Sequence, residues 1–250
     1  MSEQVQLSLQ PSGVAQITID RPERHNAMTQ AMYEALLERI AECARNPEVR
    51  AILFRGAGGK SFISGTDIAH FAEFRHGEQG IAYEAFVERV IDSVERIAVP
   101  TIAVIDGWAV GGGLALATAC DFRVCSSGSR FGAPIAKTLS NTLSSRNIAR
   151  LQAALGVPRV KKMLLLAEYI DAAEALSCGF VHEACAADQL GERAHALAER
   201  LVALSGVTQA AVKESLRRIV VEQSLEDDDL VHQVYASAAF HQGVASFLKR

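Results

Sequence analysis

The chain begins with two segments in which apolar and polar residues alternate, at positions 5–9 and 14–19. A period of two is typical of strands that bury one face and expose the other. The turn-forming residues Pro11-Ser12-Gly13 separate the two segments. We therefore predict a β-hairpin at the start of the chain.

Two later segments carry apolar residues at intervals of three or four positions, which places these residues on one face of a helix. Thr29 is a candidate N-cap for the first helix, and Pro100 ends the second. The apolar residues are Met32, Leu36, Leu37 and Ile40 in the first helix and Phe86, Val90, Val94 and Ile97 in the second. We expect both helices to pack on a sheet through these faces.

Short apolar runs at 51–54 and 101–105, and a strand-like run at 121–124, lie between the helical segments. A helix of small residues at 114–119 precedes the third run. Strands that alternate with helices favour parallel pairing, with the helices packed on the sheet. The predicted fold class is therefore α/β.

The pattern becomes almost wholly helical from about Ser144 onward. A chain of 250 residues is long enough for one good core and too short for several domains. We therefore divide it into an α/β core, residues 1–190, and a C-terminal helical region, residues 191–250.

Composition and charge exclude several classes of protein. The chain is 49% apolar and 22% charged, and 25 Lys and Arg against 29 Asp and Glu give a net charge of -4. No global basic field is therefore available to bind nucleic acid. The first residues lack a signal-peptide pattern and no apolar run is long enough to span a bilayer, so we expect a cytoplasmic protein without a membrane partner. The cysteines form no C-x-x-C pair, which favours free thiols over a metal site.

Two glycine-rich segments, at 64–67 and 107–113, each follow a predicted buried strand. A glycine-rich turn into a helix leaves backbone N–H groups unpaired, with the positive end of the helix dipole behind them. Two such groups that converge on one point form an oxyanion hole. A third segment, 56–61, ends in Gly-Lys-Ser but has Phe54 where a phosphate-binding P-loop requires its first glycine.

With their flanking residues, the two glycine segments resemble the crotonase, or enoyl-CoA hydratase/isomerase, superfamily. The resemblance extends over nearly the whole chain, and its most specific stretch is PTIAVIDGWAVGGGLALATACDFRV at 100–124. Further matches are RPERHNAM at 21–28, FISGTDI at 62–68 and two shorter ones at 173–181 and 243–248.

The resemblance implies a crotonase fold of repeated ββα units in two roughly perpendicular sheets, with C-terminal helices that support trimers or hexamers. It also implies an acyl-CoA thioester as ligand and no further cofactor. The thioester oxygen would bind the backbone N–H groups of Thr66 and Gly112. The adenine would lie on the backbone of Ser64, Thr66 and Ile68. Arg24 would lie near the phosphates, unless it is a solvated surface arginine.

The chain departs from the family at both positions that carry the proton-transferring glutamates of hydratases. Ala115 takes the place of the first, after the glycine triplet, and Ile135 takes the place of the second. Neither side chain can transfer a proton. The sequence therefore predicts weak or absent conventional hydration of enoyl-CoA. Isomerisation of the double bond by a single glutamate is disfavoured for the same reason, because neither position holds a glutamate.

Other residues are candidates to replace the missing acids. Asp67, His70 and Glu84 lie in or after the first glycine motif and can carry protons. Asn141 and Ser144 belong to a polar segment where the family has a loop beside the acyl group. Two simpler roles remain open, because Asp67 can bond the backbone of a turn and Ser144 can cap a helix.

The resulting hypothesis is an acyl-CoA enzyme, a lyase or isomerase by family, that stabilises a thioester oxyanion with two backbone N–H groups. Two alternatives remain open. One is a divergent CoA-thioester lyase, hydrolase or decarboxylase, and the other is a non-catalytic acyl-CoA-binding protein.

Overall fold

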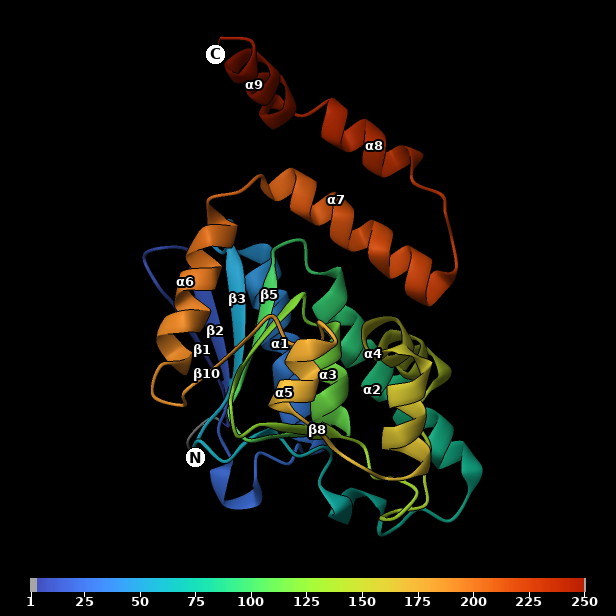
Figure 1. Ribbon diagram of the computed structural model, residues 1–250. Coiled ribbons are helices and arrows are strands. Elements are labelled where there is room, and N and C mark those ends of the chain that lie inside the picture. The colour runs from blue at the N-terminus through green and yellow to red at the C-terminus, as the bar shows by residue number, and fades with distance from the viewer. Residues whose placement is uncertain (1–3, 250) are drawn as a thin grey trace.

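The computed structural model describes residues 4–249 and contains two β-sheets surrounded by helices (Figure 1). The larger sheet has six strands in the order β1-β2-β3-β5-β7-β10, and the smaller has four in the order β4-β6-β8-β9. The larger sheet comprises β1 (Val5–Leu9), β2 (Val14–Ile19), β3 (Ala51–Gly56), β5 (Thr101–Ile105), β7 (Phe122–Ser126) and β10 (Glu183–Cys185). The smaller comprises β4 (Ser61–Ile63), β6 (Trp108–Val110), β8 (Arg130–Gly132) and β9 (Ile170–Asp171). The predicted α/β fold class is confirmed.

The helices connect these strands and form the C-terminal part of the chain. The α-helices are α1 (Gln30–Arg45), α2 (Gly77–Arg96), α3 (Gly112–Ala119), α4 (Ser145–Leu165), α5 (Ala172–Ser177), α6 (Leu190–Val202), α7 (Gly206–Arg217), α8 (Asp228–Tyr235) and α9 (Ala238–Phe247). Shorter turns are the 3₁₀ helices η1 (Pro22–Arg24) and η2 (Ile68–Phe71) and the π-helical η3 (Arg218–Glu222).

Local patterns predicted the first strands of the larger sheet correctly but missed β4, β6 and β8 of the smaller sheet, which have three residues each. Strands β1 and β2 form the antiparallel hairpin, and β3, β5 and β7 follow in parallel. Thr29 caps α1, since its hydroxyl accepts a hydrogen bond from the Met32 N–H at 3.2 Å. The nearly all-helical pattern expected after Ser144 misses β9 and β10, which have two and three residues and are too short to show a period.

Helices cover both faces of the larger sheet, which explains why its inner strands β3 and β5 are mostly apolar and buried. Figure 1 shows α6 on one side of this sheet and α2 and α3 on the other. Leu190, Ala194 and Leu197 of α6 pack in one apolar cluster with Leu53 and Ile102 of the sheet. The division of the chain at residue 190 stays a prediction.

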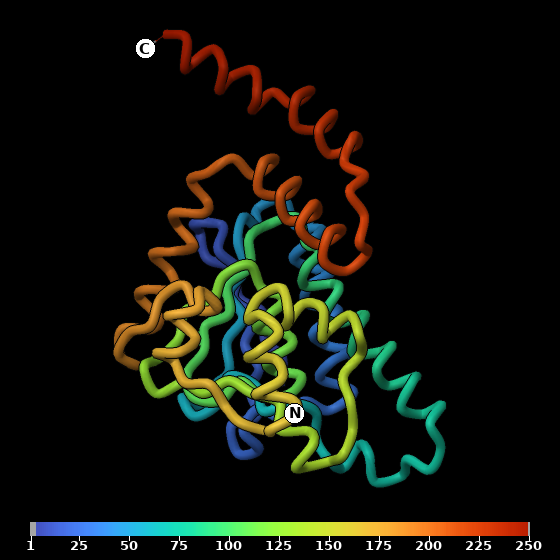
Figure 2. The backbone as a smooth tube through the Cα atoms, turned by 45° about the vertical axis from the view of Figure 1, so that its right-hand side comes forward, coloured from blue at the N-terminus to red at the C-terminus, as the bar shows by residue number. Residues whose placement is uncertain are grey.

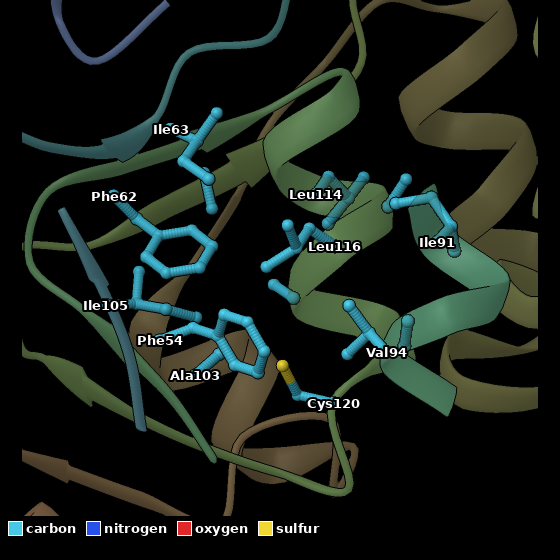
Figure 3. Packing of buried hydrophobic residues seen from close by; sticks show 14 of the residues in the cluster. Phe54, Phe62, Ile63, Ile91, Val94, Ala103, Ile105, Leu114, Leu116 and Cys120 are labelled. Carbon is cyan, nitrogen blue, oxygen red and sulfur yellow. The ribbon is translucent and has the colours of Figure 1, made fainter. Parts of the chain in front are cut away.

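Helix α3 lies at the centre of the main core. Figure 3 shows Leu114 and Leu116 of this helix between Phe62 on the strand side and Ile91 on α2. A Cβ placed on Gly113 would lie only 2.0 Å from the carbonyl oxygen of Ile63 in β4, so glycine is required at this position. The contact fixes the N-terminus of α3 beside the loop that follows β4.

The last two helices, α8 and α9, stand away from the rest of the molecule in both views (Figures 1 and 2). Large apolar side chains are exposed on this segment, with Phe247 at 76% and Leu248 at 80% exposure.

Within residues 4–249, no helix combines the length and apolar character that a bilayer crossing requires.

Candidate active site

Both glycine segments line one cavity of about 230 Å³. Its walls come from the loop after β4, the N-terminus of α3, one side of α2 and the segment 134–147 at the start of α4. Two larger hollows, of about 570 and 440 Å³, adjoin α7 and contain neither segment. We therefore take the smaller cavity as the candidate active site.

Two backbone N–H groups are free at this cavity. The loop after β4 is held by hydrogen bonds from the Met28 N–H to the Gly65 carbonyl (2.8 Å) and from the Asp67 N–H to the Met28 carbonyl (2.9 Å). The intervening Thr66 N–H makes no hydrogen bond within residues 4–249. The Gly112 N–H also makes no hydrogen bond within these residues. Gly112 is the first residue of α3, so its N–H has no acceptor in its own helix.

The two segments that carry these groups are close neighbours. A Cβ placed on Gly65 would lie 3.6 Å from the amide nitrogen of Gly112, and a Cβ placed on Gly112 would lie 4.0 Å from Oγ1 of Thr66. The N-terminus of α3 adds the positive end of its dipole at this place. The arrangement suits the binding of a negatively charged oxygen.

A chain of three hydroxyl groups adjoins the two N–H groups. Thr66 Oγ1 lies 2.9 Å from the hydroxyl of Tyr33 on α1 and 2.6 Å from the hydroxyl of Tyr83 on α2. Burial raises the pKa of Tyr33 above its ordinary value and raises the pKa of Tyr83 to about 12, so both phenols are uncharged at neutral pH. Sequence reasoning missed both tyrosines because neither belongs to a motif.

Glu84 of α2 is the acidic side chain that lines the cavity in the described part of the chain. Its Oε2 accepts a hydrogen bond of 2.7 Å from the Ser144 N–H. Burial raises the pKa of the Glu84 carboxyl, and the nearby Glu88 raises it further, against the opposing effect of that hydrogen bond.

A buried ionic cluster lies behind this wall of the cavity. Arg150 of α4, with 2% of its side chain exposed, forms ion pairs of 2.8 Å with Glu88 and with Glu95. The Ser144 hydroxyl donates to Glu88 Oε2 at 3.3 Å and so joins this cluster to the segment beside Glu84.

The structure brings together most, though not all, of the residues singled out from the sequence. The cavity is lined by Ser64, Thr66, Ile68, Gly112, Asn141 and the two substituted positions, Ala115 and Ile135. Arg24 is exposed at the end of η1, outside the cavity lining. His70 packs with Phe71, Phe74 and Tyr83, at ring-centroid distances of 5.4–5.5 Å for each pair.

The simpler roles considered for Asp67 and Ser144 are the ones that the structure shows. Asp67 accepts hydrogen bonds from the Ala69 N–H at the start of η2 (3.1 Å) and from the Arg21 guanidinium (2.7 Å). Ser144 is the N-cap of α4 and accepts from the Asn147 N–H at 3.2 Å. Neither side chain lines the cavity.

The pairing of Asp67 with Arg21 predicts a pH-dependent contribution to stability. The hydrogen bond from Arg21 lowers the pKa of Asp67 in the folded protein. The stabilisation from this pair is therefore fully present above the unfolded-state pKa of about 3.9, and it is lost as the pH falls through the lower folded-state pKa. Urea unfolding of Asp67→Asn is therefore expected to show a loss of about 1 kcal/mol at pH 7 and a smaller loss at pH 3. An equal loss at both pH values would contradict this role.

Comparison with known proteins gives matches along the whole fold. A family model described as enoyl-CoA hydratase/isomerase matches residues 10–250. The short-chain-enoyl-CoA hydratase of Clostridium acetobutylicum is 32% identical over 205 residues, which are 82% of this chain and 78% of that protein. The crotonyl-CoA hydratase of Syntrophomonas wolfei is 27% identical over 241 residues, 95% of this chain and 92% of that protein. A crystal structure described as an enoyl-CoA hydratase/carnithine racemase, from Magnetospirillum magneticum, has a TM-score of 0.89 at 28% identity and covers 100% of this chain and 94% of that chain.

Proposed function

Because the chain belongs to the enoyl-CoA hydratase/isomerase family, we propose that it binds an acyl-CoA thioester and stabilises negative charge on the thioester oxygen. The observation that carries the proposal is the pair of unengaged N–H groups of Thr66 and Gly112 at one cavity. Donors fixed in place before the reaction stabilise an enolate oxygen without reorganisation, and each donor of this kind contributes about 2.7–4 kcal/mol.

The rest of the coenzyme would extend from the cavity toward the surface. We place its adenine against the backbone of Ser64, Thr66 and Ile68, which line the cavity. Ile68 is 63% exposed, as expected for a residue at the entrance. Arg24 is exposed and free to reach the phosphates, where its guanidinium would pair with their oxygens.

Conventional hydration is expected to be very slow in this protein. Water activation and protonation of the substrate need groups that can accept and give protons, and the side chains of Ala115 and Ile135, two residues that line the cavity, are purely aliphatic. With crotonyl-CoA, we expect a turnover far below the median enzyme value of about 10 per second. Loss of the ultraviolet absorbance of the conjugated thioester measures this rate, and turnover near that median would contradict the expectation.

Calorimetric titration with butyryl-CoA, a saturated thioester, tests the binding part of the proposal separately. Saturable binding is expected even where hydration fails, because the donors that hold the thioester oxygen are backbone groups. Absence of binding would contradict the proposed function.

A second candidate function is acyl-CoA binding without chemistry, and the absence of acidic groups at positions 115 and 135 favours it. Binding of butyryl-CoA with no turnover across a panel of acyl-CoA thioesters, and with no proton exchange at the acyl α-carbon, would support this candidate.

The protein is proposed to assemble as a trimer, or as a hexamer formed by two trimers. The exposed apolar side chains of Tyr235 on α8, Phe247 on α9 and Leu248 directly after α9 support an assembly through the C-terminal helices. Sedimentation velocity of the full chain measures the state directly, and a monomer at micromolar concentration would contradict it. A cytoplasmic location stays a prediction.

A further inference from the structure

Glu84 occupies a distinct place in the candidate site. It projects from α2, whereas the substituted positions Ala115 and Ile135 belong to α3 and to the segment after β8. One carboxylate oxygen, Oε2, is held by the Ser144 N–H at 2.7 Å. The other, Oε1, makes no hydrogen bond or ion pair within residues 4–249. A carboxyl group with one anchored oxygen and one free oxygen is therefore fixed in the cavity wall.

The charges around Glu84 favour its taking up a proton as well as releasing one. Arg150, the cation of the ionic cluster behind the cavity wall, is already paired with Glu88 and Glu95 at 2.8 Å each. Glu84 itself has no cationic partner among the described residues, and the neighbouring Glu88 carboxylate repels its negative charge. Burial and this repulsion raise the pKa of Glu84 toward neutral pH, against the opposing hydrogen bond from Ser144. An acid–base group is most efficient when its pKa lies near the working pH.

We propose that Glu84 is the catalytic acid–base residue of this site and acts on acyl-CoA thioesters that carry a hydrogen on the α-carbon. The inference rests on the proposed function, because it requires a thioester bound at Thr66 and Gly112. Thr66, Gly112 and Glu84 line the same cavity, so the carbonyl oxygen and the α-carbon of one thioester can meet the two donors and the Glu84 carboxyl together.

The step is a reversible enolisation. The Glu84 carboxylate removes the α-proton, and the electron pair of the broken C–H bond forms the double bond between the α-carbon and the carbonyl carbon. The carbonyl electron pair moves to the thioester oxygen, where the Thr66 and Gly112 N–H groups stabilise the enolate. Return of the proton from Glu84 regenerates the thioester, so no co-reactant is needed.

Exchange of the α-hydrogens of butyryl-CoA with deuterium in D₂O measures this step directly by nuclear magnetic resonance. Glu84→Gln is the variant of choice, because the amide oxygen of glutamine can still accept the Ser144 N–H. We expect the exchange rate to fall by about 10²- to 10⁴-fold, with the Kd for butyryl-CoA nearly unchanged. Glu78→Gln, on the exposed first turn of the same helix, is the matched control and should exchange at the original rate.

The pH profile of the unmodified protein is a second readout that does not depend on a variant. A carboxylate base predicts an exchange rate that rises with pH until Glu84 is ionised and then levels off. The titratable and charged groups around it are Tyr33 from α1, His70 from η2, Tyr83 and Glu88 from α2, and Arg150 from α4. Both tyrosines have raised pKa values and stay protonated over this range.

The outcomes separate the two proposals. Failure of the unmodified chain to bind butyryl-CoA would overturn the proposed function and, with it, the role of Glu84. Binding without exchange in the unmodified chain, or exchange at the original rate in a folded Glu84→Gln variant, would overturn the role of Glu84 alone. If circular dichroism shows that the variant does not fold, the pH profile decides: a rise to a plateau supports the role, and a flat profile overturns it.

Discussion

Replacing Gly112 by valine is expected to lower α-proton exchange of butyryl-CoA by at least about 100-fold and to weaken its binding, while the chain remains folded. A Cβ at this position would lie 2.7 Å from the hydroxyl of Tyr33, so the phenol must move and Thr66 loses a hydrogen-bond partner. The valine methyl groups would also occupy the space in which the thioester oxygen meets the Gly112 N–H. Gly112 has no left-handed backbone conformation, so the helix itself can accept valine.

Gly128→Val is the matched control for this substitution. Gly128 lies in an exposed turn, and a Cβ there would meet nothing within 4 Å. Calorimetry and the deuterium-exchange assay should therefore give the original values for Gly128→Val. Unchanged binding and exchange in a folded Gly112→Val protein would show that the Gly112 N–H does not hold the thioester.

Replacing Arg150 by methionine is expected to lower the free energy of unfolding by about 3–5 kcal/mol at pH 8. Arg150 is 2% exposed at its side chain and pairs with two largely buried carboxylates, Glu88 and Glu95. Removing the Arg150 cation leaves the Glu88 and Glu95 carboxylates buried with no positive charge to balance theirs, and this destabilises the folded state. Urea denaturation measures the loss, and Arg96→Met serves as control, since Arg96 is 50% exposed and its ion pairs should contribute at most about 1 kcal/mol.

The stability of the Arg150→Met protein should also depend on pH in a defined direction. Burial raises the pKa of Glu95 and Arg150 opposes this rise, so removal of Arg150 raises the pKa further. A carboxyl whose folded pKa lies above its unfolded value destabilises the fold as the pH rises, because the folded state must give up a proton that it holds more tightly. The deficit should therefore be smaller at pH 5 than at pH 8, and the reverse order would contradict this account.

Patterns confined to neighbouring residues were enough to predict much of the fold. The hairpin, the Thr29 cap and the buried strands each depend on a local period or a single capping residue. The glycine-rich turns indicated where free N–H groups could lie, but Thr66 and Gly112 were identified through the resemblance to the crotonase superfamily, and their role as thioester donors stays a prediction.

The parts that escaped prediction depend on contacts between distant segments. Tyr33 is 33 residues from Thr66, and Tyr83 is 17 residues from it, so no sequence period links the three hydroxyl groups. Arg150 lies 62 residues from Glu88. In each case the polar residue stands on the buried face of a helix, and only the packing of that helix determines its partner.

The close contact between Gly113 and the Ile63 carbonyl has an evolutionary consequence. It fixes two backbone segments beside each other, and the donors proposed to bind the thioester oxygen belong to the backbone as well, whereas the proposed proton-transferring group is a side chain from a different helix. Substitutions along the cavity can therefore exchange one proton carrier for another without disturbing the groups that hold the charge. With Ala115 and Ile135 in this cavity, the chain can therefore keep the backbone donors proposed for the thioester oxygen while its proposed acid–base group, Glu84, lies on another wall.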